Sequence, residues 1–216
     1  GQVVLKEMAG YERGRAVGEV PALLHSALLQ NGLAADCVQI QLDEVRAVRD
    51  ILRWARAGDV LALPVHGLAG GCGASTFASN LAWELATISK TDAPLVCLID
   101  FDFQYGSAAT YLDLPRKEAV FDLLSDTANA DSDALLAAML TFNDKLHVLT
   151  APSDMLPLDI VGPEEIGRII DMARANFDFV IIDMPRTIVA WTETVLSRAH
   201  VYFALIELDL RSAQNV

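Results

Sequence analysis

The segment Gly67–Thr76 reads GLAGGCGAST and places several glycines shortly before two residues with hydroxyl side chains. Glycines let the backbone curl with its N–H groups pointing inward, and the N-terminus of a following helix adds unpaired N–H donors. A hydroxyl at the start of that helix can bind Mg²⁺ beside a phosphate. The pattern therefore predicts a phosphate-binding loop. The residues expected to bind the ligand are Gly70, Gly71, Cys72, Gly73, Ala74, Ser75 and Thr76, with Ser75 also on the metal.

Acidic side chains follow two apolar segments further along the chain. Asp100 and Asp102 stand in LIDFDFQYG, and Asp183 stands in VIIDMP. Ligands of open parallel sheets bind outside the carboxyl ends of the strands, and carboxylates there suit a metal ion and a water molecule beside a phosphate group. We therefore expect Asp100 and Asp183 to join Ser75 as metal ligands. The alternative, that each aspartate only caps the next turn, stays open at this point.

The elements that must position these residues alternate along the chain between apolar strands and amphipathic helices. This alternation predicts an α/β fold with a mostly parallel sheet covered by helices on both faces. The expected strands are 3–8, 37–42, 59–67, 94–103, 146–152, 178–183 and 201–209. The expected helices are 19–33, 43–58, 75–89, 118–126, 132–142, 163–177 and 190–198.

The same pattern predicts two parts of the chain. Residues 1–58 form a βαβα segment, and residues 59–216 form the domain that carries the glycine-rich loop. The last residues, LRSAQNV, begin a further helical pattern that a parallel sheet would need as cover. We therefore expect the sequence to be cut short at this end.

Composition and charge exclude several classes of protein. Hydrophobic residues make up 53% and charged residues 21% of the chain, as in folded globular domains. The net charge is −13, and residues 67–216 hold nine Lys/Arg against 21 Asp/Glu, which disfavours binding to nucleic acid. The three cysteines form no CxxC pair, so we expect a reducing cytoplasm and no zinc site. No apolar run is long enough to span a membrane.

Three separated motifs carry a resemblance to a known family. GLAGGCGASTFASNLAW, LIDFDFQYG and FVIIDMP together resemble the deviant Walker ATPases of the MinD/ParA family. AGGCGAST, DFDFQYGSAATYLDL and DMPRTIVAWTETVLSRAHVYFALIELDLRSAQN further resemble its CpaE/TadZ branch, which serves the assembly of Flp-type pili. The resemblance runs from Val60 to the end of the sequence. It implies ATP and Mg²⁺ as cofactors, a nucleotide-dependent homodimer, pilus or secretion assembly proteins as partners, and a cytoplasmic location at the cell pole or the inner face of the membrane.

The resemblance also assigns roles and marks two departures. It implies that Asp183 is the Walker B acid and that Asp102 orients the attacking water in active relatives. The lysine that reaches across the family's dimer aligns with Ala69, and the Walker lysine aligns with Ala74. Because phosphoryl transfer depends on neutralising charge on the γ-phosphate, we expect binding with slow or absent hydrolysis. Arg186 either replaces the lost charge or is a surface arginine paired with acids.

The first 58 residues do not show the receiver-like pattern expected of a CpaE/TadZ protein, because no acidic pair ends a first strand. The segments RGRAVGEV and DEVRAVRDIL instead resemble the C-terminal, Mur-ligase-like domain of cyanophycin synthetases. So short a piece holds no complete ligase site. We therefore expect a structural role, either as extra strands in the same sheet or as a small neighbour packed against it.

Three functions remain open from the sequence. The first is an ATP-binding scaffold, weakly hydrolysing or non-hydrolysing, that localises or assembles a Flp/Tad-type pilus secretion machine. The second is an active MinD/ParA-type ATPase for positioning or partitioning, against which stand Ala69 and Ala74. The third is a structural or ligase-derived domain that binds no nucleotide.

Overall fold

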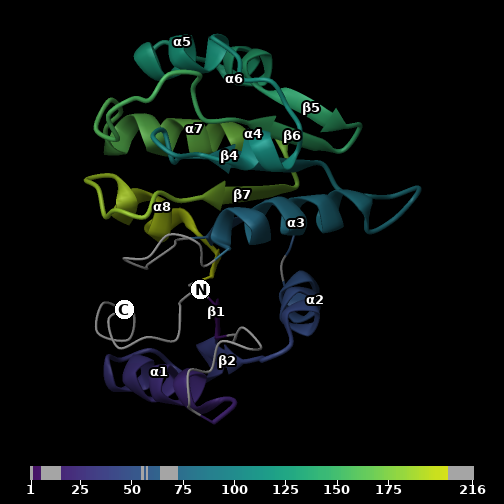
Figure 1. Cartoon of the computed structure of the whole chain (residues 1–216), viewed down its shortest axis with the longest axis vertical. Coiled ribbons are helices and arrows are strands. Elements are labelled where there is room, and N and C mark those ends of the chain that lie inside the picture. The colour runs from purple at the N-terminus through teal and green to yellow at the C-terminus, as the bar shows by residue number, and fades with distance from the viewer. Residues whose placement is uncertain (1, 6–15, 55, 57, 64–72, 204–216) are drawn as a thin grey trace.

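An eight-stranded sheet organises the part of the chain that the computed structural model describes, residues 2–5, 16–54, 56, 58–63 and 73–203 (Figure 1). The strands are β1 (Gln2–Leu5), β2 (Val38–Ile40), β3 (Asp59–Leu63), β4 (Val96–Asp100), β5 (Leu140–Asn143), β6 (Leu146–Leu149), β7 (Phe179–Asp183) and β8 (Val201–Tyr202). Their order across the sheet is β2-β1-β8-β3-β7-β4-β6-β5. Every neighbouring pair is parallel except β5 and β6.

The helices lie on both faces of this sheet, because its central strands present apolar side chains to either side. They are α1 (Glu19–Gln30), α2 (Glu44–Trp54), α3 (Ala74–Thr87), α4 (Ala108–Tyr111), α5 (Ala119–Ser125), α6 (Ser132–Ala138), α7 (Pro163–Asn176) and α8 (Thr192–Arg198). On β4, Val96 and Leu98 pack in the core with α3, whereas Cys97 and Ile99 pack in the core with α5 to α8. The α/β fold predicted from the sequence is thus confirmed.

Helix α7 shows how local sequence sets an element that supports the sheet. Pro163 occupies the first turn, where a missing N–H costs nothing, and the carboxylate of Glu165 accepts the N–H of Gly162 at 3.0 Å. Ile166 and Ile170, one turn apart, are fully buried against the sheet. The predicted helix over 163–177 therefore agrees with α7.

The predicted helix over 132–142 is wrong in its last part. Helix α6 ends at Ala138, and β5 follows as an antiparallel edge strand beside β6. The turn between the two strands is closed by Asn143, whose side-chain oxygen accepts the N–H groups of Lys145 and Leu146 at 2.8 and 2.7 Å. Thr141 and Phe142 favour a strand, so the hairpin overrides the helical spacing of the preceding leucines.

The N-terminal segment extends the same sheet. Strand β1 pairs with β8 on one side and with β2 on the other, so β1 and β2 lie beyond β8 in the lower half of Figure 1. Helix α1 packs on them through Val20 and Leu24. Of the two arrangements expected for residues 1–58, the described residues form extra strands in the sheet. The division of the chain after residue 58 stays a prediction.

Two further expectations concern the ends of elements. A short 3₁₀ turn at Ala35–Cys37 precedes β2, so that strand is shorter than the predicted 37–42. Residues 204–216, on which the predicted strand 201–209 and the suspected last helix depend, lie outside the described residues. Within the described residues, no helix combines the length and the apolar character needed to cross a lipid bilayer.

Candidate functional site

Three neighbouring strands end side by side at the carboxyl edge of the sheet. In the register of the sheet, Asp183 at the end of β7 lies opposite Leu63 at the end of β3 and opposite Asp100 at the end of β4. The backbone N–H of Phe101 donates to the carbonyl of Asp183 at 2.9 Å and holds the two strand ends together. The two aspartates that the sequence placed after different strands are therefore adjacent in the fold.

Asp183 is a buried carboxylate without a hydrogen-bond partner among the described residues. Its side chain is 1% exposed, and neither Oδ1 nor Oδ2 makes a hydrogen bond within that part of the chain. Burial, together with the charges of Asp100 and Asp102, raises the pKa of Asp183 from 3.8 to about 8, against opposing effects of Ser75 and Arg186. A carboxylate held in this way gains a great deal from a cation that replaces its lost solvation.

Asp100 is equally buried but satisfied by the backbone. Its Oδ1 accepts the N–H of Asp102 at 3.1 Å, and its Oδ2 accepts the N–H of Ala108 at 3.0 Å. Burial raises the pKa of Asp100 to about 7, while these two hydrogen bonds and the charge of Arg116 oppose the rise. Asp100 therefore anchors the loop after β4 as well as facing Asp183.

Asp102 turns its side chain toward its own loop. Its Oδ1 accepts the N–H of Gln104 at 3.3 Å and the N–H of Tyr105 at 3.0 Å, and the residue is half-buried. This capping contact is the alternative that the sequence left open for every strand-end aspartate. The role of Asp102 in orienting water stays a prediction.

The start of α3 lies next to Asp183. Gly73 precedes the helix with φ 81, in the left-handed region that favours glycine, and Ala74 begins the helix. Ser75 and Thr76 follow in the first turn, and the Ser75 hydroxyl is near enough to lower the pKa of Asp183. The predicted residues Ala69, Gly70, Gly71 and Cys72 lie outside the described residues, so the form of the loop itself stays a prediction.

The oxygen donors at this edge of the sheet suit Mg²⁺, which needs few protein ligands, better than a metal ion whose ligands all come from protein. Within the described ranges, no group of three or more His, Cys, Asp or Glu side chains is arranged to hold a metal ion. The side chain of Asp102 is engaged with its own loop, and the role of Asp100 as a metal ligand stays a prediction. Mg²⁺ commonly takes one or two protein oxygens and completes its shell with water and phosphate oxygens. The Asp183 carboxylate and the Ser75 hydroxyl fit that requirement.

Two residues that the sequence did not single out set the shape of the site. A Cβ atom at Gly106 would lie 2.6 Å from both carboxylate oxygens of Asp100, so no other residue fits there without displacing the loop. Arg116 donates from one nitrogen to the carbonyl of Gly106 at 2.8 Å and from another to the carbonyl of Pro152 at 2.7 Å. In the sequence, the glycine that ends LIDFDFQYG was the only sign of the close approach between Gly106 and Asp100. Nothing in the sequence indicated the hydrogen bonds of Arg116.

Comparisons with known proteins agree with this architecture, although no family model matches the chain. The septum site-determining protein MinD of Helicobacter pylori is 29% identical over 148 residues, which cover 68% of this chain and 52% of MinD. The sporulation initiation inhibitor protein Soj of Bacillus subtilis is 31% identical over 125 residues, which cover 54% of this chain and 46% of Soj. The chain thus spans about half the length of the curated relatives it matches.

Solved structures show the same fold at low sequence identity. A ParA family ATPase from Chlorobium tepidum superposes with a TM-score of 0.57 at 20% identity, covering 68% of this chain and 60% of its own. MinD of Pyrococcus horikoshii in complex with Mg-ADP gives a TM-score of 0.53 at 16% identity, covering 68% and 57%. Sequence similarity and fold together relate the chain to the P-loop ATPases of the MinD/ParA type.

Proposed function

We propose that the chain binds ATP with Mg²⁺ at the ends of β3 and β7 and hydrolyses it slowly or not at all. In this proposal it acts as a scaffold that localises or assembles a Flp/Tad-type pilus secretion machine, as its resemblance to the CpaE/TadZ branch implies. The sequence similarity to MinD and the fold shared with a ParA family ATPase support nucleotide binding. The complex of Pyrococcus horikoshii MinD with Mg-ADP supports the choice of cofactor.

The position of Asp183 beside Ser75 is the observation that carries the proposal. Asp183 is buried, has no hydrogen-bond partner among the described residues, and lies next to the first turn of a 14-residue helix. The unpaired N–H groups of that turn favour a negatively charged phosphate. A bound Mg²⁺ would supply positive charge between the phosphates and the carboxylate. Ser75 and Asp183 would hold the metal, and Thr76 with the glycines before it would hold phosphate.

Slow hydrolysis follows from the loss of a cation at the start of α3. Ala74 is 3% exposed and brings no charge to the position where the resemblance places the Walker lysine. Arg186 acts on Asp183 electrostatically, but it is exposed. Loss of a single donor of this kind costs on the order of a hundredfold or more in rate. A protein that binds but does not turn over can still switch, if ATP favours one conformation or a homodimer.

Binding of a fluorescent ATP analogue, with and without Mg²⁺, tests the site when phosphate release is measured beside it. We expect Mg²⁺-dependent binding without release at ordinary ATPase rates. Asp183→Asn should remove the part of the affinity that depends on Mg²⁺, because the charged ligand is lost. Glu84→Gln, an exposed carboxylate on the same helix as Ser75, is the matched control and should bind as the parent does.

The results separate the three functions that the sequence left open. Fast phosphate release favours the active positioning or partitioning ATPase, and absence of binding favours the structural domain. Ala74→Lys restores the missing charge and should raise nucleotide affinity or phosphate release. If it changes neither, the pocket differs from its relatives by more than one charge. The scaffold role is tested by whether a strain lacking the protein still assembles pili at the same place in the cell.

A further inference from the structure

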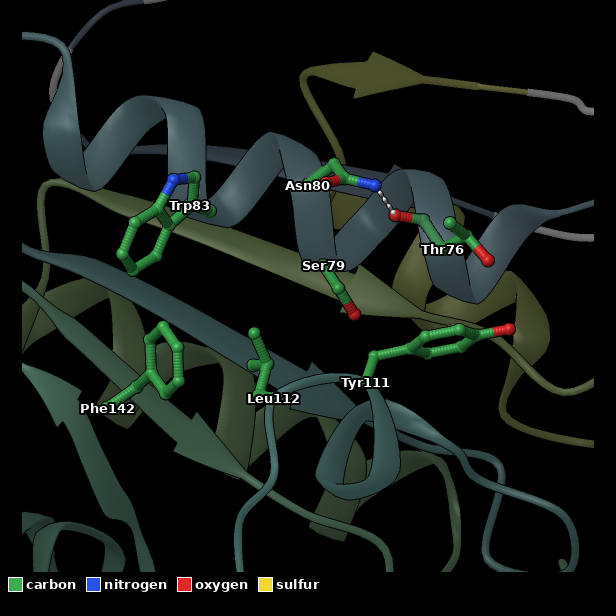
Figure 2. Close-up of a pocket in the computed structure, with 7 residues that line it drawn as sticks. All are labelled: Thr76, Ser79, Asn80, Trp83, Tyr111, Leu112 and Phe142. Carbon is green, nitrogen blue, oxygen red and sulfur yellow. Dashed lines mark hydrogen bonds between the residues drawn. The ribbon is translucent and has the colours of Figure 1, made fainter.

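A pocket of about 280 Å³ lies beside the candidate nucleotide site, between α3, α4 and the edge strand β5. Figure 2 shows its walls, with the side chains of α3 above and those of α4 and β5 below. The lining residues are Thr76, Ser79, Asn80, Trp83, Tyr111, Leu112 and Phe142. Of these residues, Thr76 alone has a role in the function proposed above.

Aromatic side chains form two sides of the pocket. Trp83 and Phe142 meet edge to face with ring centroids 5.2 Å apart, and Tyr111 lies at the other end of the pocket (Figure 2). Trp83 and Tyr111 remain 40% and 54% exposed, although both are large enough to gain from burial. A flat apolar group placed between them would cover these rings and gain edge-to-face contacts.

One buried polar atom points into the same space. Ser79 is 5% exposed, and its Oγ has no hydrogen-bond partner within the described residues. Figure 2 shows this hydroxyl directed from α3 toward the gap between Leu112 and Tyr111. A buried hydroxyl in a native protein normally has a hydrogen-bond partner, so a polar atom placed in the pocket beside Ser79 would gain a hydrogen bond.

The lining also limits the ligand by charge and size. Its seven residues include three with aromatic rings and none with a charged side chain. An ionised ligand would find no counter-charge among these seven residues, which favours a neutral ligand. A dry cavity of about 150 Å³ holds one benzene ring, so this pocket, nearly twice as large, has room for two fused rings.

We propose that this pocket binds a small neutral molecule with two fused aromatic rings, whose polar edge hydrogen-bonds to Ser79 while its faces lie against Trp83 and Tyr111. The site is separate from the metal and phosphate ligands, since Thr76 alone is shared between the two. The proposal therefore stands whether or not the chain binds ATP.

Indole and indene form a suitable pair of probes, because indene carries CH₂ where indole carries N–H. Binding of each to the full chain is followed by chemical shifts of ¹⁵N-labelled protein. We expect both probes to bind and indole to bind more tightly. Ser79→Ala should weaken indole about two- to tenfold, the range of one net hydrogen bond, and leave indene unchanged.

Two exposed tryptophans provide a matched pair of variants. Trp83→Leu should weaken both probes several-fold, whereas Trp54→Leu, at a tryptophan 42% exposed on α2, should change neither. The proposal is overturned if neither probe binds the parent protein or if the two tryptophan variants act alike. It is also overturned if Ser79→Ala weakens indole and indene equally. A change in sedimenting mass on Trp83→Leu would overturn it as well, because the face would then join copies of the chain.

Discussion

The buried carboxylate at the end of β7 makes the stability of the metal-free protein depend on pH in an unusual direction. In the unfolded chain, Asp183 loses its proton near its ordinary pKa of 3.8. In the folded chain, it keeps the proton until the pH reaches its raised pKa of about 8. Between these values, unfolding releases a proton, so the free energy of unfolding falls as the pH rises. Asp183→Asn keeps the shape of the side chain and removes this titration.

The size of the effect follows from the width of that interval. One proton retained over about three pH units, from about pH 5 to about pH 8, corresponds to about 4 kcal/mol. The free energy of unfolding of Asp183→Asn, relative to the parent, should therefore rise by about 4 kcal/mol across this range. Any constant cost of the buried amide cancels, because only the change with pH is compared.

Equilibrium urea denaturation without added metal, repeated at several pH values on both proteins, measures this difference. Glu84→Gln, an exposed carboxylate on α3, serves as the control and should follow the parent at every pH. A relative gain for Asp183→Asn below about 1 kcal/mol between the two ends of the range would refute the reasoning. Asp183 would then be solvated or paired in the folded protein, and the argument that it is available to bind Mg²⁺ would fail.

Three further predictions concern the same edge of the sheet. Affinity for Mg²⁺-nucleotide should rise up to about tenfold per pH unit between about pH 6 and about pH 8, because Asp183 must lose its proton first; titrations at each pH measure it. Gly106→Ala should lower the free energy of unfolding by about 1–3 kcal/mol in urea, because the new Cβ lies 2.6 Å from the Asp100 oxygens. Gly73→Val should abolish nucleotide binding, because valine does not adopt a φ of 81. The control Gly32→Val, at a glycine with φ 93 beyond α1, should lower the free energy of unfolding and leave binding intact. Normal binding by Gly73→Val would contradict the site.

The sequence by itself determined the order of the elements and the kinds of chemistry available. Short apolar strands separated by amphipathic helices indicate a parallel sheet buried on both faces, so the fold class follows from periodicity. An aspartate at the end of such a strand must lie at the carboxyl edge. Asp100 and Asp183 could therefore be assigned to one edge from the sequence, before their separation was known.

Only the tertiary structure decided which of these residues meet and in what state. Strand order puts β7 between β3 and β4, and this placement makes Asp183 adjacent to both Asp100 and the start of α3. Among the described residues, the Asp183 carboxylate and the Ser79 hydroxyl have no hydrogen-bond partner, and this state depends on packing between elements distant in sequence. The hairpin β5–β6 was missed for the same reason, because pairing at a sheet edge outweighed local helical spacing. Periodicity records which face of an element is buried, but burial and hydrogen bonding of a single polar atom depend on the neighbours that the whole fold supplies.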